Sequence, residues 1–421
     1  MKSRKKLWAA CLLGTAFCLM AAPQVEAGQN SESSTIVRTD PAQVAKLREI
    51  RQEKAESQRR QTRQAASSEQ RKIRDVFQKR KDDPRGNKKI QYITRWETEA
   101  ADSGGTLLLS DSPEYVSSDG ILYEDKVDGS ARVFYYHLND TKQPKKIAVV
   151  LTCEDDDFTK VHVRRGGMNG GSDNYFAVGK AVQAEYFENS LRETLYFMKG
   201  STQLLQPRMS EVVLQPGEIV CGMYDFDTTH PIKVSVLMYP TDADPCSFVK
   251  TAKILPKSES RLRGTFQGMN RTISGKSTYD PAANEAVYVC LADGDFDPFK
   301  VGVDATDGSV VVNYGNYGVL YRVKLKAKNT MPTRYMLMPL GGTYAGVMTA
   351  SQGSFGKKEM LMIPLGKTFF GENGIYGVEV ITLDTDLADL GVYDGSKEVI
   401  FEFSPPGASN LPVNLVMMPS K

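Results

Sequence analysis

The chain has 421 residues, and its Lys and Arg outnumber its Asp and Glu by two. That length accommodates two or three domains, and no stretch after the N-terminal leader is long and apolar enough for a membrane-spanning helix. The small net charge hides an asymmetry. Residues 41–95 hold 17 basic and 7 acidic residues, a net of +10, and residues 1–40 add +2, so residues 96–421 carry −10. The charge pattern predicts a basic arm followed by an acidic body.

Residues 1–27 are predicted to form a cleaved signal peptide. "KSRKK" is a basic n-region, "LWAACLLGTAFCLM" is an apolar h-region, and "VEA" is a small-x-small cleavage signature. Cys11 and Cys18 lie inside the h-region without the triplet that precedes a lipid-modified cysteine, so we favour signal cleavage over a lipoprotein anchor. The mature chain would begin at Gly28 with a flexible segment, 28–40. It would be secreted or associated with the cell envelope.

Residues 41–95 form the basic arm. Asp40 and Pro41 suit the start of a helix, but no large apolar residue lies between Arg51 and Lys72, which excludes a continuous coiled coil. We expect a marginal helix or a partly disordered tether, acting as a spacer or as an anchor on anionic cell-surface polymer or lipid. No base-reading motif accompanies the charge, so we expect no nucleic-acid partner. The candidate anchoring residues are Arg59, Arg60, Arg63, Arg71, Lys72 and Arg74.

The body is predicted to be duplicated. "VVLTCEDDDFTKVHV" resembles "VYVCLADGDFDPFKVGV", which aligns Phe158 with Phe296, and further on "VSVLMYP" resembles "VNLVMMP". Similar segments in the same order indicate two copies of one fold. The first repeat would span 102–242 and the second 260–421, with 243–259 as the linker.

Each repeat has the pattern of a β-sandwich. "ARVFYYHLN", "KKIAVVLT", "TKVHVRR", "YFAVGKAV" and "IKVSVLMY" are short, β-rich segments, and turn signals such as those at 127–130 and 306–308 separate such segments. The predicted fold class is mainly β: two tandem β-sandwich domains, Ig-like or jelly-roll-like, after a basic α-helical or partly disordered arm.

One segment has the spacing of a calcium loop. "DGDFDPFKVGVD" places carboxylates at positions 1, 3, 5 and 12, but an EF-hand also requires glycine at position 6, where this chain has Pro298. We therefore predict a corner between strands in which Phe296, like Phe158, packs inward and an aspartate caps the turn. Whether the acidic side chains bind a cation at a different kind of site is left open; the candidates are Asp293, Asp295 and Asp297.

Two other segments could contact a ligand. "RRGGMNGGSDN" is predicted to be a flexible hairpin loop whose Arg164 and Arg165 could bind an anionic group, with Asn169 and Asn174 nearby. "NYGNYGVLYR" places Tyr314 and Tyr317 among glycines, and tyrosines of this kind either stack on sugar rings or pack within the fold. Packing is the favoured interpretation.

The residues that carry most enzyme chemistry are sparse. The three histidines, His137, His162 and His230, lack metal-ligand spacing, and no nucleophile elbow or phosphate-binding loop is present. We assign no catalytic residue, no metal ligand and no cofactor. Four cysteines would survive signal cleavage, and alternation along the strands predicts that Cys153 and Cys221 face the core as a disulfide pair, which would leave Cys246 with Cys290.

The segments "RVFYYHLNDTKQPKKIAVVLT", "YFAVGKAV", "RLRGTFQG" and "GNYGVLYRV" resemble an uncharacterised class of secreted bacterial proteins with two related β-domains. Members are sometimes found beside copper amine oxidase-like modules. The resemblance implies an exported, envelope-associated protein and no particular activity. The resemblance does not imply a copper amine oxidase site in this chain. A quinone-forming tyrosine would need an acid after Asn-Tyr, and here Gly315 follows Asn313-Tyr314.

These observations favour an exported, non-enzymatic interaction or structural protein of the cell envelope. Its partners would be anionic polymer or lipid through the arm, and a glycan or a protein through the body. Two alternatives remain: a carbohydrate-binding module, and a secreted hydrolase whose active-site residues are dispersed along the sequence.

Overall fold

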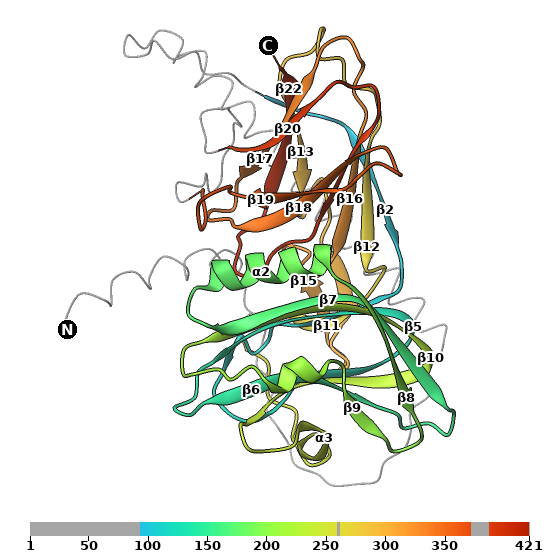
Figure 1. Ribbon diagram of the computed structural model, residues 1–421, viewed down its shortest axis with the longest axis vertical. Coiled ribbons are helices and arrows are strands. Elements are labelled where there is room, and N and C mark those ends of the chain that lie inside the picture. The colour runs from blue at the N-terminus through green and yellow to red at the C-terminus, as the bar shows by residue number, and fades with distance from the viewer. Residues whose placement is uncertain (1–92, 259–261, 372–386, 421) are drawn as a thin grey trace, which may run out of the picture. The chain divides into compact units, whose positions relative to one another are not determined.

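The computed structural model describes residues 93–258, 262–371 and 387–420. The predicted signal peptide, the 28–40 segment and almost all of the basic arm, with its six candidate anchoring residues, lie outside these residues. The last residues of the predicted arm are not helical, because Thr94–Arg95 form strand β1. Strands dominate and helices are few (Figure 1), which confirms the mainly β fold class. No helix among the described residues is long and apolar enough to cross a membrane.

The largest sheet has eleven strands and is organised around two very long ones. β5 (Gly120–Asn139) and β10 (Ile219–Pro240) pair antiparallel over most of their length, and β10 then pairs with β7 along one half and with β6 along the other. The 127–130 turn signal does not end a strand, because β5 continues through it with Gly129 at a φ of 74°. The other members are β3 (Thr106–Ser110), β4 (Tyr115–Val116), β6 (Lys145–Thr152), β7 (Thr159–Ser172), β8 (Ser190–Phe197), β9 (Thr202–Leu204), β11 (Arg263–Gln267), β14 (Lys300–Val303) and β15 (Val310–Asn313).

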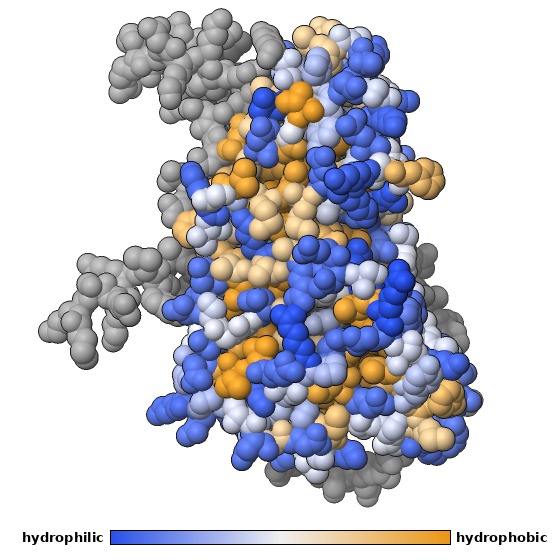
Figure 2. Space-filling view, viewed as in Figure 1, coloured by the Kyte–Doolittle hydropathy of each residue, from blue (hydrophilic) through white to orange (hydrophobic). Residues whose placement is uncertain are grey.

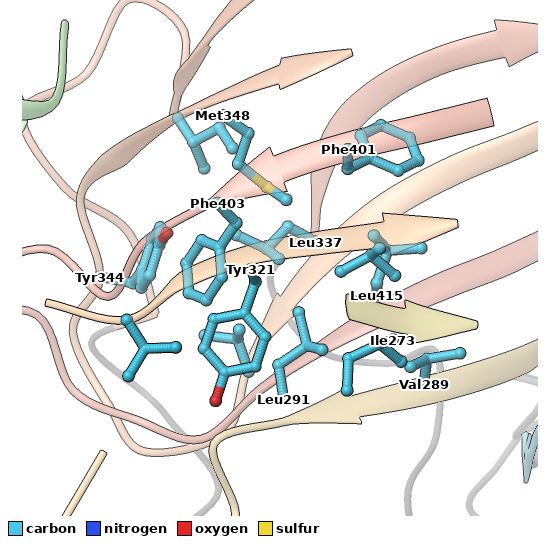
Figure 3. Packing of buried hydrophobic residues seen from close by; sticks show 14 of the residues in the cluster. Ile273, Val289, Leu291, Tyr321, Leu337, Tyr344, Met348, Phe401, Phe403 and Leu415 are labelled. Atoms are coloured by element: carbon cyan, nitrogen blue, oxygen red, sulfur yellow. The ribbon is translucent and has the colours of Figure 1, made fainter. Parts of the chain in front are cut away.

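Two smaller sheets, of five and six strands, are built mostly from the C-terminal half. Their facing side chains form one apolar core, in which Tyr321 and Phe403 pack beside Leu337 and Leu415 (Figure 3), as expected of a β-sandwich. The five-stranded sheet holds β1, β13 (Val287–Leu291), β17 (Thr333–Pro339), β20 (Ala388–Tyr393) and β22 (Val413–Pro419). The six-stranded sheet holds β2 (Thr98–Ser103), β12 (Asn270–Gly275), β16 (Leu320–Leu325), β18 (Gly346–Gln352), β19 (Glu359–Ile363) and β21 (Val399–Phe403).

Strand pairing crosses the boundary between the two predicted repeats. β11, β14 and β15 come after the predicted linker, yet they extend the eleven-stranded sheet from β3. In return, β1 and β2 come before the first repeat's long strands, yet they pair with β13 and β12 in the smaller sheets. Each sheet therefore contains strands from both parts of the sequence, and the 243–259 boundary does not separate the sheets.

The two repeats share one feature of strand pairing. β6 pairs antiparallel with the end of β10 in the first repeat, and the corresponding β13 pairs antiparallel with β22 in the second. Duplication stays a prediction, and this shared pairing is consistent with it.

Helix α2 (Tyr175–Glu188) contains "YFAVGKAV", which the sequence pattern predicted as a strand. That prediction is wrong. The Asn174 side chain accepts a hydrogen bond from the Ala177 N–H at 3.2 Å and caps the helix, and Val178, Val182 and Tyr186 recur every four residues as its buried face. The two shorter helices are η1 (Pro207–Ser210) and α3 (Pro245–Phe248).

α2 contacts β7 on one side and β18 and β19 on the other. Gln183 donates to the Ser404 carbonyl and accepts from the Val347 N–H at 2.6 Å, and Lys180 donates to the Pro364 carbonyl at 2.7 Å. The helix therefore joins the eleven-stranded sheet to the six-stranded one. Figure 2 shows apolar side chains reaching the surface among hydrophilic ones in the region of α2, β18 and β19.

The glycine-rich segment "RRGGMNGGSDN" is not a flexible hairpin loop, because most of it belongs to β7 and pairs with β10. A Cβ on Gly166 would lie 2.0 Å from the Tyr224 ring, and one on Gly167 would lie 2.6 Å from the Val182 carbonyl of α2. The glycines are needed for this close packing.

Candidate functional site

The outer face of the β7–β8 pair carries an exposed aromatic surface. Lys160 pairs with Tyr196 and His162 with Thr194 across the two strands, so side-chain alternation places them on one face with Phe158 and Met198. Phe158 is 50% exposed, Tyr196 57% and Met198 71%. We call these six residues the aromatic face: Phe158, Lys160, His162, Thr194, Tyr196 and Met198.

The aromatic face has an ordered geometry. The rings of Phe158 and Tyr196 are nearly parallel, 20° apart, with centroids separated by 6.0 Å. The Lys160 ammonium lies 6.0 Å from the Phe158 centroid, and His162 Nδ1 lies 3.2 Å from Thr194 Oγ1. An apolar surface is thereby flanked by a cation and by groups that donate and accept hydrogen bonds, a combination suited to binding an amphipathic ligand.

The opposite faces of these strands explain why Phe158 turns outward. Thr159, Val161, Val163 and Phe197 are buried in the core. The prediction that Phe158 and Phe296 pack inward is wrong for both residues. Phe296 is also about half exposed, and the Arg95 guanidinium lies 3.8 Å above its ring.

The carboxylates of the apparent calcium loop are bound by the protein itself. Asp293 caps the corner, as predicted, by accepting the N–H groups of Asp295, Phe296 and Asp297. Asp297 is buried, and its oxygens accept from Arg271 at 2.6 Å, from the Tyr321 hydroxyl at 2.6 Å and from the Ala292 N–H at 2.6 Å.

Asp304, the last carboxylate of that window, accepts from Arg263 at 2.9 Å. Because protein donors already occupy Asp297 and Asp304, the spacing reflects structural ion pairs. Among the described residues, no three His, Cys, Asp or Glu side chains are grouped as a metal site.

A third buried ion pair, through Arg132, links the sequence before the predicted linker to the sequence after it. Arg132 on β5 binds Asp225 on β10 at 2.6 and 2.9 Å, and it donates to the carbonyls of Met269 and Gly318 at 2.7 and 3.1 Å. Burial alone would raise the pKa of Asp225, but Arg132 and Arg165 outweigh it and lower that pKa to about 2. This pair is structural.

The candidate ligand contacts predicted from sequence have mixed outcomes. Arg165 is held inside the fold, because it donates to the Tyr186 hydroxyl at 2.6 Å and packs on that ring. Arg164 pairs with Asp227 at 2.8 Å. Tyr317 donates to the Ser409 carbonyl at 2.8 Å and packs against Phe134, whereas Tyr314 is exposed. The structure does not bring these four residues together into one site.

The predicted disulfide is absent, and all four described cysteines are free. Cys153 packs in one apolar core, with Val149 and Leu151, whereas Cys221 packs in another, with Tyr136 and Met223. Both are core-facing, as predicted, but they lie in different cores.

A cluster of acids and tyrosines lies at the end of β3. Burial raises the pKa of Asp111 well above its usual value, the nearby Glu114 raises it further, and burial also raises the pKa of Glu114. Among the residues that the structure describes, Asp111 Oδ1 finds no hydrogen-bond partner. The acids lie within electrostatic range of the Tyr136 and Tyr317 hydroxyls. Such a pair resembles the carboxyls of acid–base catalysts.

A serine–histidine contact lies close by. Ser110 Oγ is 2.8 Å from His137 Nε2, and His137 Nδ1 is 2.8 Å from the Pro113 carbonyl. Both side chains are fully buried, and burial lowers the pKa of His137 to about 4. The neutral imidazole therefore fastens β3 to β5, and Ser110 does not face solvent as a nucleophile would.

Comparisons with known proteins identify no family. No family model and no curated protein matches the chain. The CUB1-EGF-CUB2 domain of human MASP-1/3 is 9% identical with a TM-score of 0.15, covering 77% of this chain and 99% of that one. PNGF-II is 12% identical with a TM-score of 0.13, covering 78% and 65%. An 11S globulin from Wrightia tinctoria is 8% identical with a TM-score of 0.11, covering 77% and 84%. Likenesses this weak assign neither a family nor a ligand.

Proposed function

We propose that this chain is an exported, non-enzymatic binding protein that holds a glycan on its aromatic face. The observation that carries the proposal is the parallel pair of exposed rings, Phe158 and Tyr196, beside Lys160 and the His162–Thr194 hydrogen bond. The C–H face of a sugar ring is apolar and packs on aromatic rings, whereas its hydroxyls require donors and acceptors at the edge. A glycan therefore requires both an apolar surface and hydrogen-bonding groups, and the aromatic face offers both.

The aromatic face meets a further requirement, because its anchors are already rigid. β7 and β8 are fixed by their pairing and by the buried residues on their inner sides. A preformed site loses little conformational entropy on binding, which suits a flat ligand of modest affinity. The cation Lys160 favours glycans with acidic units over neutral ones.

Affinity electrophoresis against neutral and uronate-containing polysaccharides would test this proposal. Phe158→Ala and Tyr196→Ala should each weaken retardation about tenfold, equivalent to about 1.4 kcal/mol. Phe355→Ala removes an even more exposed ring elsewhere and should leave binding unchanged. Equal behaviour of all three variants, or no retardation of the unmodified protein by any polysaccharide, would reject the aromatic face as a glycan site.

The acid–tyrosine cluster supports a second candidate, a hydrolase. Burial raises the pKa of both Asp111 and Glu114, and Glu114 raises that of Asp111 further, so a carboxyl here can keep its proton as a general acid must. Release of reducing ends from a bound polysaccharide, lost in Asp111→Asn and Glu114→Gln but kept in Phe355→Ala, would favour this candidate. Binding without release would favour the non-enzymatic one.

For the arm we propose contact with anionic cell-surface polymer or lipid. The net +10 of residues 41–95 supports this, because each basic residue near an anionic membrane contributes about 1 kcal/mol, screened over roughly 8 Å at physiological salt. Binding to acidic vesicles should weaken as salt rises. It should be lost when the six candidate basic residues become Gln. Salt-independent binding would make the arm a spacer.

A further inference from the structure

The β14–β15 hairpin turns four of its five valines outward, with Val311 buried as the exception, and it buries polar residues. Lys300, Asp304 and Asn313 are buried: Lys300 binds Asp102 at 2.8 Å, and Asp304 binds Arg263. Because side chains alternate along a strand, the residues between them point away from the core. A one-residue shift of register would have buried the valines, so the buried ion pairs fix the outward orientation.

The outward residues of the hairpin are apolar or aromatic. Val301 is 63% exposed, Val303 46%, Val310 53% and Tyr314 62%. Val303 pairs with Val310 and Val301 with Val312 across the hairpin, and the Phe299 and Tyr314 rings meet edge to face at 5.5 Å. We call this surface the valine face: Phe299, Val301, Val303, Val310, Val312 and Tyr314.

The hairpin also ends its sheet. Within the described part of the chain, β15 pairs with β14 alone, so its outer edge has no strand beside it. Edge strands of monomeric proteins usually carry a charged side chain, a proline or a bulge that discourages association. The sequence of β15 is VVVN, which has none of these.

We propose that the valine face is the contact between two copies of this chain, packed face to face about a twofold axis. Its exposed apolar area is on the order of 400 Å² a copy, about the size of the largest apolar patch on a typical monomer, which is often a functional surface. A standard interface removes about 800 Å² a partner, so the valine face would form the apolar centre and its polar surroundings the rim.

A second copy suits this surface better than a different protein. The valine face has no charge and few polar groups with which to select an unlike partner. Two identical apolar surfaces, in contrast, are chemically complementary to each other, and a twofold arrangement closes after two subunits. The inference is independent of glycan binding, since it concerns a different strand pair and a different measurement.

Sedimentation equilibrium of the mature chain, at concentrations up to roughly 100 µM, would test the proposal, because an interface of this size is expected to be weak. The unmodified chain should approach the mass of a dimer. Val310→Glu should raise the dissociation constant tenfold or more, since a charge would be buried against valines. Val392→Glu makes the same change at an exposed valine on β20 and should have no effect.

A mixing experiment would show that the contact is direct. A Val301→Lys, Val310→Lys chain and a Val301→Glu, Val310→Glu chain should each be monomeric, and an equimolar mixture should recover dimers. A monomeric unmodified chain would overturn the proposal. A monomer is the result expected if a segment of the same chain covers the valine face. Equal effects of Val310→Glu and Val392→Glu, or mixed chains that remain apart, would also overturn it.

Discussion

Replacing Arg132 with methionine would test what holds together the sequence before the predicted linker, 243–259, and the sequence after it. The side chain binds Asp225 through two nitrogens and donates to the Met269 and Gly318 carbonyls, which come from the other part of the sequence. Methionine keeps much of the apolar stem but leaves Asp225 charged and buried. Breaking a buried pair in this way costs about 3–5 kcal/mol, a large fraction of the roughly 5–15 kcal/mol that stabilises a typical domain.

Urea unfolding followed by circular dichroism would measure this loss, with Arg334→Met as the control. Arg334 pairs with Asp389 at 2.7 Å, but both side chains are well exposed, so about 0–1 kcal/mol is expected. A double variant, Arg132→Met with Asp225→Leu, should recover part of the stability, because the buried carboxylate is gone and Arg165, which pairs with it at 3.3 Å, is partly exposed and keeps its hydrogen bond to Tyr186. If Arg132→Met costs no more than the control, the buried pair does not hold the two parts together.

Four further outcomes are expected. The part of the chain before β11, expressed alone, should not fold cooperatively, because three strands of its sheet come from later sequence; a sharp melting transition would contradict this. The free energy of unfolding should fall as pH rises through the raised pKa values of Asp111 and Glu114, since the folded state keeps their protons longer, and Asn and Gln variants should flatten that slope. Gly166→Val should lower the free energy of unfolding by about 1–3 kcal/mol, and Tm with it, because it clashes with the Tyr224 ring, whereas Gly275→Val, where a Cβ meets nothing closer than 3.3 Å and φ is not positive, should lower it less. Peptide mapping without reduction should find all four described cysteines unlinked.

Local patterns predicted the fold class but not the pairing of strands. Alternating β-branched and aromatic residues in "KKIAVVLT" and "IKVSVLMY" predicted strands that the structure contains. Which strand lies beside which depends on contacts between residues far apart in sequence, such as Leu108 with Thr265. No local signal reports those contacts, so the exchange of strands between repeats was missed.

Helix α2 and the aromatic face were missed for related reasons. "YFAVGKAV" has β-rich composition, and only the Asn174 cap and the spacing of Val178 and Val182 indicate a helix. Phe158 follows an acidic turn, and large aromatic residues are usually buried, so an inward orientation was expected. The strand register sets the orientation of Phe158: its neighbour Thr159 faces the core, so Phe158 faces outward.

The predicted Cys153–Cys221 disulfide was also wrong because it depended on tertiary structure. Alternation correctly identified both side chains as core-facing. It could not show that the two thiols lie in different apolar cores. Proximity across a sheet requires knowledge of which core each residue enters.

The exchange of strands also sets an order of events during synthesis. β3 is made early, but β11, which covers its edge, and β14 and β15 beyond it are made only after the long strands and α2. Until residue 313 has left the ribosome, the eleven-stranded sheet lacks one side, and an unpaired edge invites pairing with other chains. A chain with this topology gains from being kept unfolded until it is complete, as happens to proteins threaded through a membrane channel before they fold.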